Sequence, residues 1–237
     1  MALALQICSY LVGIPLELLA IAAILRSGGY RRFPLVFAWV IGDFLTTAVE
    51  MPSNLAYLYT KRVDAQHWLV NYYWIDEAIM QILVFAVVIG LIFMATTDLP
   101  QRRTLRAALI AFAVLFAGVS FLIHFDRQLN MGAWLTPWNR DLNVCSAILD
   151  LALWALLLTS KKKDHRLLLL SGALGINFTG QAIGASLRQL AIAARSRPLV
   201  NLGNTVVVLT YLLLLYIWWQ AFRTPRALPS VERRADG

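Results

Sequence analysis

Charged residues are scarce in this chain. Asp, Glu, Lys and Arg make up 14% of its 237 residues, whereas a soluble domain usually carries about 25%. Seven long apolar segments occupy nearly all of the sequence, and each is long enough to cross a bilayer, which takes about 20 apolar residues. They run over residues 4–25, 34–59, 71–95, 104–124, 140–159, 166–194 and 198–222. The pattern leaves no room for a soluble domain and predicts an all-α integral membrane protein, a seven-transmembrane-helix bundle.

Cysteine and histidine are also rare, with two and three residues respectively. There is no C-x-x-C motif, and the histidines lack the paired spacing that zinc or a b-type haem would need. We therefore expect no metal site and no cofactor. Cys8 and Cys145 both fall in the outer halves of predicted spans, so a disulfide is one interpretation, and two buried free thiols are the simpler one.

The usual motifs of membrane enzymes and retinal proteins are missing. No span contains Lys, which excludes a retinal Schiff base of the microbial rhodopsin kind. An intramembrane protease would need a Ser/His pair, an HExxH motif or an Asp dyad with GxGD, and Gly42-Asp43 is only a fragment of the last. No clustered Asp motif for Mg²⁺ and a prenyl or phosphatidyl substrate is present. A lipid-modifying enzyme is therefore the least favoured function.

The distribution of basic residues predicts the orientation of the bundle. Fourteen of the 21 Lys and Arg residues follow the first, third, fifth and seventh spans. The side richer in positive charge faces the cytoplasm, so the N-terminus is expected outside and the C-terminus inside a cell (inner or plasma) membrane. This asymmetry explains the net charge of +8 without a nucleic-acid partner. The first 25 residues contain no Lys or Arg, so no cleavable signal peptide is expected.

One domain is expected. Residues 1–222 form the seven-helix transmembrane domain, and residues 223–237, with two prolines and mixed charges, read as a disordered cytoplasmic tail. Gly180 and Gly184 form a GxxxG pair in the sixth span, which predicts close helix packing inside the bundle in preference to a dimer contact. The seventh span has few polar residues, and Tyr211 is one of them.

Polar residues inside the spans are the best clue to function, because they are costly in a bilayer and usually face the bundle interior. At ~1.5 Å per residue, Glu17 and Asp43 each lie about 13–14 Å from the cytoplasmic ends of their spans, and Asp150 and Asn177 about 16 Å. Four helices thus place a polar residue near mid-membrane, with no Lys or Arg at that depth. Such a layer favours a proton, a metal or alkali cation, or a cationic organic ligand. The alternative is that each acid is protonated and bonds a neighbouring helix.

A second polar group is predicted at the outer rim. Glu50 lies seven residues after Asp43 and hence on the same helix face, with Thr46 and Thr47 between them. The expected outer vestibule consists of Tyr73, Trp74, Asp76, Glu77 and Arg188. It would lead down the Glu50–Asp43 face to the mid-membrane acids. The alternative is a set of interfacial ion pairs within an aromatic belt.

These patterns predict a polytopic membrane protein, transporter-like or receptor-like, that binds a small molecule, a cation or a proton within the helix bundle. The predicted ligand-binding residues are Glu17, Asp43, Glu50, Asp150 and Asn177. The alternative function is a non-catalytic accessory or structural subunit of a larger complex. The expected partners are therefore the lipid bilayer, a small ligand and, under the alternative, another membrane protein.

Overall fold

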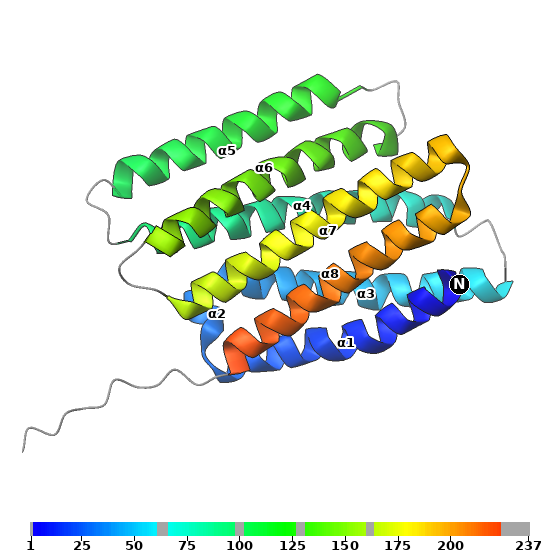
Figure 1. Ribbon diagram of the computed structural model, residues 1–237, viewed down its shortest axis with the longest axis horizontal. Helices are drawn as coiled ribbons and strands as arrows, with labels where there is room; N and C mark the ends of the chain where they lie inside the picture. The colour runs from blue at the N-terminus through cyan, green and yellow to red at the C-terminus, as the bar shows by residue number, and fades with distance from the viewer. Residues whose placement is uncertain (1, 61–65, 98–101, 127–130, 160–163, 224–237) are drawn as a thin grey trace, which may run out of the picture.

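The computed structural model describes residues 2–60, 66–97, 102–126, 131–159 and 164–223. Within these ranges the chain forms eight helices and no strand (Figure 1). Seven of them are long and apolar enough to cross a membrane: α1 (Ala2–Arg26), α3 (Pro34–Thr60), α4 (Gln66–Ala95), α5 (Arg102–His124), α6 (Met131–Thr159), α7 (His165–Ala194) and α8 (Arg197–Arg223). The short helix α2 (Gly29–Arg32) is a single turn between α1 and α3. The predicted all-helical architecture is confirmed.

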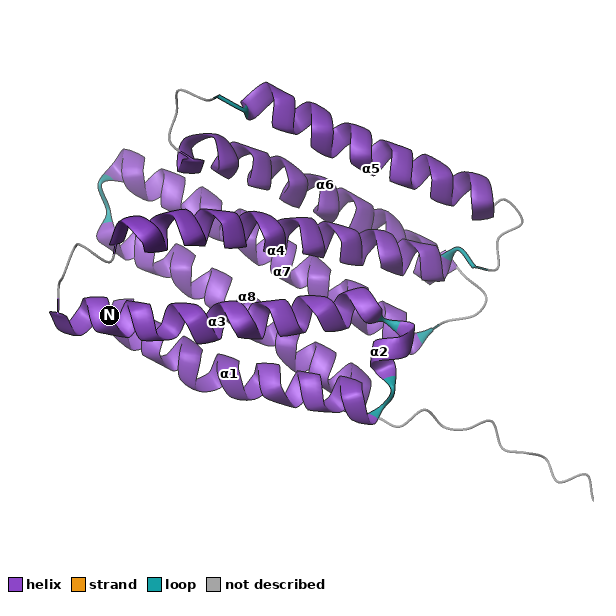
Figure 2. Cartoon of the chain, turned by 180° about the vertical axis from the view of Figure 1, so that it is seen from behind, coloured by secondary structure: helices purple, strands orange, loops and turns teal. Residues whose placement is uncertain are grey.

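Six of the long helices form a ring. Each packs against the next in the order α1, α3, α4, α6, α7 and α8, and α8 packs against α1 again. Helix α5 lies along one edge of the bundle in both views and packs against α4 and α6 (Figures 1 and 2). The end of the bundle that contains α2 is called here the α2 end, and the opposite end, where α1 begins, is the far end.

Apolar side chains fill the half of the ring near the α2 end. The indole rings of Trp39 and Trp218 meet edge to face with centroids 5.1 Å apart, and Phe33 meets Phe222 in the same way at 5.6 Å. The indole nitrogen of Trp218 donates a hydrogen bond to the carbonyl oxygen of Leu170 at 3.2 Å. Because these large rings are almost fully buried, this half of the ring is closed.

Helices α7 and α8 approach each other backbone to backbone, side by side along the bundle (Figure 1). A Cβ atom added to Gly184 would lie 2.9 Å from the carbonyl oxygen of Gly203, and one added to Gly203 would lie 2.8 Å from the carbonyl oxygen of Gly184. Gly180, one turn before Gly184, faces Thr210 of α8. The GxxxG pair is therefore used for packing within the chain.

The start of α6 differs from the sequence-based prediction. The pattern predicted a loop over 125–139 and a helix from residue 140, whereas α6 begins at Met131 and continues through Pro137. Leu135 and Trp138 are buried in a cluster with side chains of α4 and α5, and the Trp138 indole donates to the carbonyl oxygen of Ala117 at 3.1 Å. Burial of these side chains stabilises the extra turns and offsets the N–H group that proline lacks.

Two further predictions concern the thiols and the C-terminal tail. Cys145 is buried and free, in line with the simpler interpretation for that residue, while the side chain of Cys8 lies outside the described part of the chain. The predicted tail, 223–237, also lies outside it, except for Arg223, the last residue of α8.

Candidate functional site

Three helices bring polar side chains together inside the ring. The hydroxyl of Tyr211 on α8 lies 2.8 Å from Glu17 Oε1 on α1 and also hydrogen-bonds Asp43 Oδ2 on α3. Thr47, one turn after Asp43, donates to the same Glu17 oxygen at 3.2 Å. The other oxygen of Glu17, Oε2, is buried without a hydrogen-bond partner among the described residues. We call these four residues the Tyr211 junction.

The Tyr211 junction has more acceptors than donors. A phenol carries one proton and donates one hydrogen bond at a time, yet the Tyr211 oxygen lies within hydrogen-bonding distance of both Glu17 and Asp43. If both carboxyl groups were ionised, one of them would face the phenol oxygen with no proton between the two oxygens. One additional proton, on either carboxyl group, satisfies every contact. The arrangement is therefore suited to hold a shared proton, or a cation in its place.

The surroundings of the Tyr211 junction are acidic. The charged groups that act most strongly on Asp43 are all carboxyl groups, from Glu17, Asp76 and Glu50. Asp76 on α4 accepts a hydrogen bond from Thr46 of α3 at 2.8 Å, which ties α4 to the helix that contains Asp43. A group of carboxylates that outnumbers its basic neighbours attracts cations.

The predicted vestibule residues are partly brought together at the far end. The Tyr73 hydroxyl and the Glu77 carboxyl group on α4 lie close enough to interact. Arg188, near the end of α7, is close enough to act electrostatically on both. Glu50 interacts electrostatically with Asp76 and Glu77, so it links this group to the Tyr211 junction. Trp74 meets the ring of Tyr73 edge to face with centroids 5.3 Å apart, and its indole also covers Gly132 of α6.

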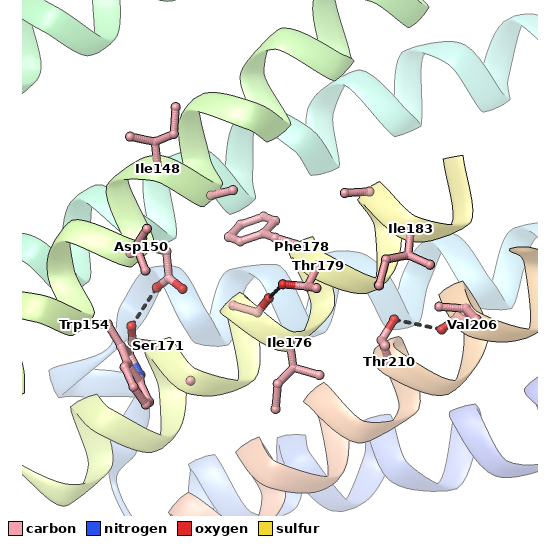
Figure 3. A pocket seen from close by; sticks show the side chains of 16 residues that line it. Ile148, Asp150, Trp154, Ser171, Ile176, Phe178, Thr179, Ile183, Val206 and Thr210 are labelled. Carbon is pink, nitrogen blue, oxygen red and sulfur yellow. Dashed lines mark hydrogen bonds between the residues drawn. The ribbon is translucent and has the colours of Figure 1, made fainter. Parts of the chain in front are cut away.

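The four residues of the predicted mid-membrane layer do not form one cluster. Glu17 and Asp43 meet at Tyr211, but Asp150 on α6 accepts a hydrogen bond from Ser171 on α7 at 2.7 Å and lines a separate groove (Figure 3). Asn177 on α7 is also buried, and its Oδ1 atom has no partner among the described residues. Depth along a helix follows from residue counting, but the direction in which each side chain points around the ring does not.

Sequence reasoning missed Tyr211, which joins the two carboxyl groups. Tyr211 lies twelve residues before the end of α8 at Arg223, which is about 18 Å along the helix axis. That depth is only a few ångströms from the estimates for Glu17 and Asp43. The same residue counting, applied to tyrosine, would therefore have included Tyr211 in the layer.

A set of carboxamides in the far half of the bundle was also left out of the predicted site. Asn143 of α6 donates to Gln181 of α7 at 3.2 Å. Buried side-chain atoms without a partner among the described residues include Gln81 Nε2, Asn143 Oδ1, both polar atoms of Asn139, and Glu77 Oε2. Since buried polar groups normally pair with protein or ordered water, these atoms indicate a polar interior in this half.

Helix α5 is fastened to the ring by its own polar contacts. Asp141 of α6 accepts a hydrogen bond from Ser120 at 2.8 Å and lies 2.9 Å from His124 Nε2. Ser120 and His124 of α5 therefore pair with Asp141 of α6, which indicates a structural role for these residues. No group of three or more His, Cys, Asp or Glu in the described ranges could hold a metal ion.

Comparison with known proteins identifies no relative of this chain. No protein-family model, curated protein or solved structure matches this chain.

Proposed function

We propose that the chain crosses a cell membrane seven times, with the far end outside and the α2 end in the cytoplasm, and that it binds a proton or a small cationic molecule at the Tyr211 junction. It would act as a transporter-like or receptor-like protein. The observation that supports this proposal best is the single Tyr211 hydroxyl that lies between the carboxyl groups of Glu17 and Asp43.

The chemistry of binding follows from the proton count at the junction. A cationic group would replace the shared proton, so that both carboxyl groups become ionised. Tyr211 would then donate to one of them, and the cation would pair with the other. The unpartnered Oε2 atom of Glu17 offers an additional acceptor. Charge-assisted hydrogen bonds of this kind are stronger than neutral ones.

The difference between the two halves of the ring supports access of a cation to the Tyr211 junction from the far end. Glu50, Asp76 and Glu77 interact electrostatically along that route, and their negative charge would draw a cation toward Asp43. On the α2 side the Trp39–Trp218 contact closes the interior. We therefore propose that a ligand reaches the site from the far end.

The first test is thermal unfolding of the detergent-purified protein with a panel of alkali cations and cationic metabolites. A ligand that binds only the folded state at 100 times its Kd stabilises it by about 2.7 kcal/mol. We expect at least one cation to raise the Tm of the wild type and to leave Asp43→Asn unchanged. Since cation and proton compete for the same carboxyl groups, the shift should grow as the pH rises.

The control for this test is Asp150→Asn, which changes a buried acid that does not contact the Tyr211 junction. It should retain the cation response of the wild type. A panel without any effect on the wild type, or a response that survives in Asp43→Asn, would contradict the proposal. Either result would favour the accessory-subunit function and a search for a protein partner.

A further inference from the structure

A groove lies between α6, α7 and α8, away from the Tyr211 junction (Figure 3). Its volume is about 760 Å³, within the usual range of about 300–1,000 Å³ for small-molecule sites. Ile148 and Leu151 of α6 and Ile183 of α7 line it and are 63%, 71% and 47% exposed. Because these side chains belong to helices of membrane-spanning length, the groove opens toward lipid.

Glycines of α7 form part of the wall of the groove. Gly172, Gly175 and Gly180 all line it. A Cβ atom on Gly172 would lie 3.3 Å from the indole nitrogen of Trp154, and one on Gly180 would overlap Thr210. Trp154 and Thr210 therefore pack directly on these glycines, and the wall of the recess is largely apolar.

One carboxyl group, that of Asp150, lies in the wall of this recess. Asp150 is 2% exposed, and its Oδ1 atom accepts the hydrogen bond from Ser171 (Figure 3). Its Oδ2 atom accepts no hydrogen bond within the described ranges and lies 3.2 Å from the place that a Cβ atom on Gly175 would take. A carboxylate oxygen that lines an apolar groove without a donor is costly, so this atom is suited to accept a hydrogen bond from a bound molecule.

The two threonine hydroxyls of the groove already donate hydrogen bonds. The hydroxyl of Thr179 donates to the carbonyl oxygen of Gly175 at 2.8 Å, and that of Thr210 donates to the carbonyl oxygen of Val206 at 3.0 Å (Figure 3). Their oxygen atoms can still accept, but an ionised carboxylate oxygen accepts more strongly than a hydroxyl, so Asp150 Oδ2 is the strongest acceptor in the groove.

We propose that this groove binds an amphipathic molecule from the bilayer, with an apolar body along the groove and a hydrogen-bond-donating head, a hydroxyl or an ammonium group, on Asp150 Oδ2. Anionic heads are disfavoured because they would face a carboxylate. A transmembrane helix from another chain fits this chemistry less well, because its backbone N–H groups are already bonded within the helix. This site is separate from the Tyr211 junction, and the proposal does not depend on it.

The test is photolabelling of the full-length protein in lipid nanodiscs. The probes are three diazirine-tagged saturated chains of equal length: a primary alcohol, a primary amine and a methyl ester. Peptides that cover residues 147–154 and 171–183 should be labelled by the alcohol and the amine. Labelling by the ester, which has no donor, should be about tenfold weaker, as expected for loss of a hydrogen bond to a charged group.

Variants locate the site. Asp150→Asn keeps the shape of the side chain and should reduce labelling by the amine about tenfold. Thr179→Trp and Ile183→Trp, two independent ways to fill the groove, should abolish labelling of those peptides by all three probes. Leu122→Trp, on the exposed face of α5 (75% exposed), is the matched control and should be labelled like the wild type. Only variants with the wild-type Tm are compared.

Two outcomes would overturn this proposal. Equal labelling in Thr179→Trp, Ile183→Trp and Leu122→Trp would mean that the probes report general contact with lipid. No labelling of the wild-type groove, together with intermolecular crosslinks between its walls in a dimer, would mean that a second copy covers it.

Discussion

Replacement of Gly184 by Leu should push α7 away from α8 and lower the thermal stability of the protein. A Cβ atom alone at this position would lie 2.9 Å from the carbonyl oxygen of Gly203, and a backbone atom cannot rotate away as a side chain can. Overpacking usually costs about 1–3 kcal/mol and sometimes more, and we expect at least the upper end here. For a chain of this size, about 3 kcal/mol corresponds to a fall in Tm of roughly 6–12 °C.

The matched control for Gly184→Leu is Gly118→Leu on α5. A Cβ atom at Gly118 would have no atom within 4 Å, so the same change in size and composition should leave the Tm close to that of the wild type. The measurement is thermal unfolding in detergent, followed by the near-ultraviolet signal of the tryptophans. Equal melting of the two variants would show that the α7–α8 contact does not hold the bundle together.

Replacement of Tyr211 by Phe should abolish the response to cations. The change removes the donor between Glu17 and Asp43 and keeps the ring and its packing. Loss of a hydrogen bond to a buried carboxyl group should also lower the free energy of unfolding by about 1–3 kcal/mol. Both effects can be measured by thermal unfolding with and without the cation that stabilises the wild type most.

Infrared difference spectroscopy can follow the shared proton directly. The wild type should show the carbonyl stretching band of a protonated carboxylic acid, which Tyr211→Phe should shift and cation binding should remove. The control is Tyr216→Phe on the same helix, because Tyr216 is exposed and its hydroxyl contacts Gln220. If Tyr211→Phe kept its stability, its band and its cation response, the site would have to lie elsewhere in the bundle.

The long helices could be predicted from sequence because their cause is local. A run of about 20 apolar residues between charged loops is a property of the chain itself, and the last span was predicted over 198–222 where α8 covers Arg197–Arg223. The start of α6 could not be predicted in this way. Its first turns form because Leu135 and Trp138 are buried against α4 and α5, which are distant in sequence.

The candidate site could likewise be predicted only in part from the sequence. Glu17 and Asp43 were expected at one depth, because rise per residue is a constant of the helix, and the structure does bring them together. Asp150 was expected beside them, yet it bonds Ser171 on another side of the ring. Whether Glu17 or Asp43 binds any ligand stays a prediction.

By itself the sequence determined that the chain is helical, that seven of its helices can span a membrane, and that a few acids lie deep within them. Each of these follows from composition and spacing along one helix. Only the tertiary structure decided that Tyr211 joins Glu17 to Asp43, that the half near α2 is closed by tryptophan rings, and that Asp150 lies in a groove. These depend on the rotation of each helix about its axis and on which helices are neighbours, and both are set by packing between residues far apart in the chain.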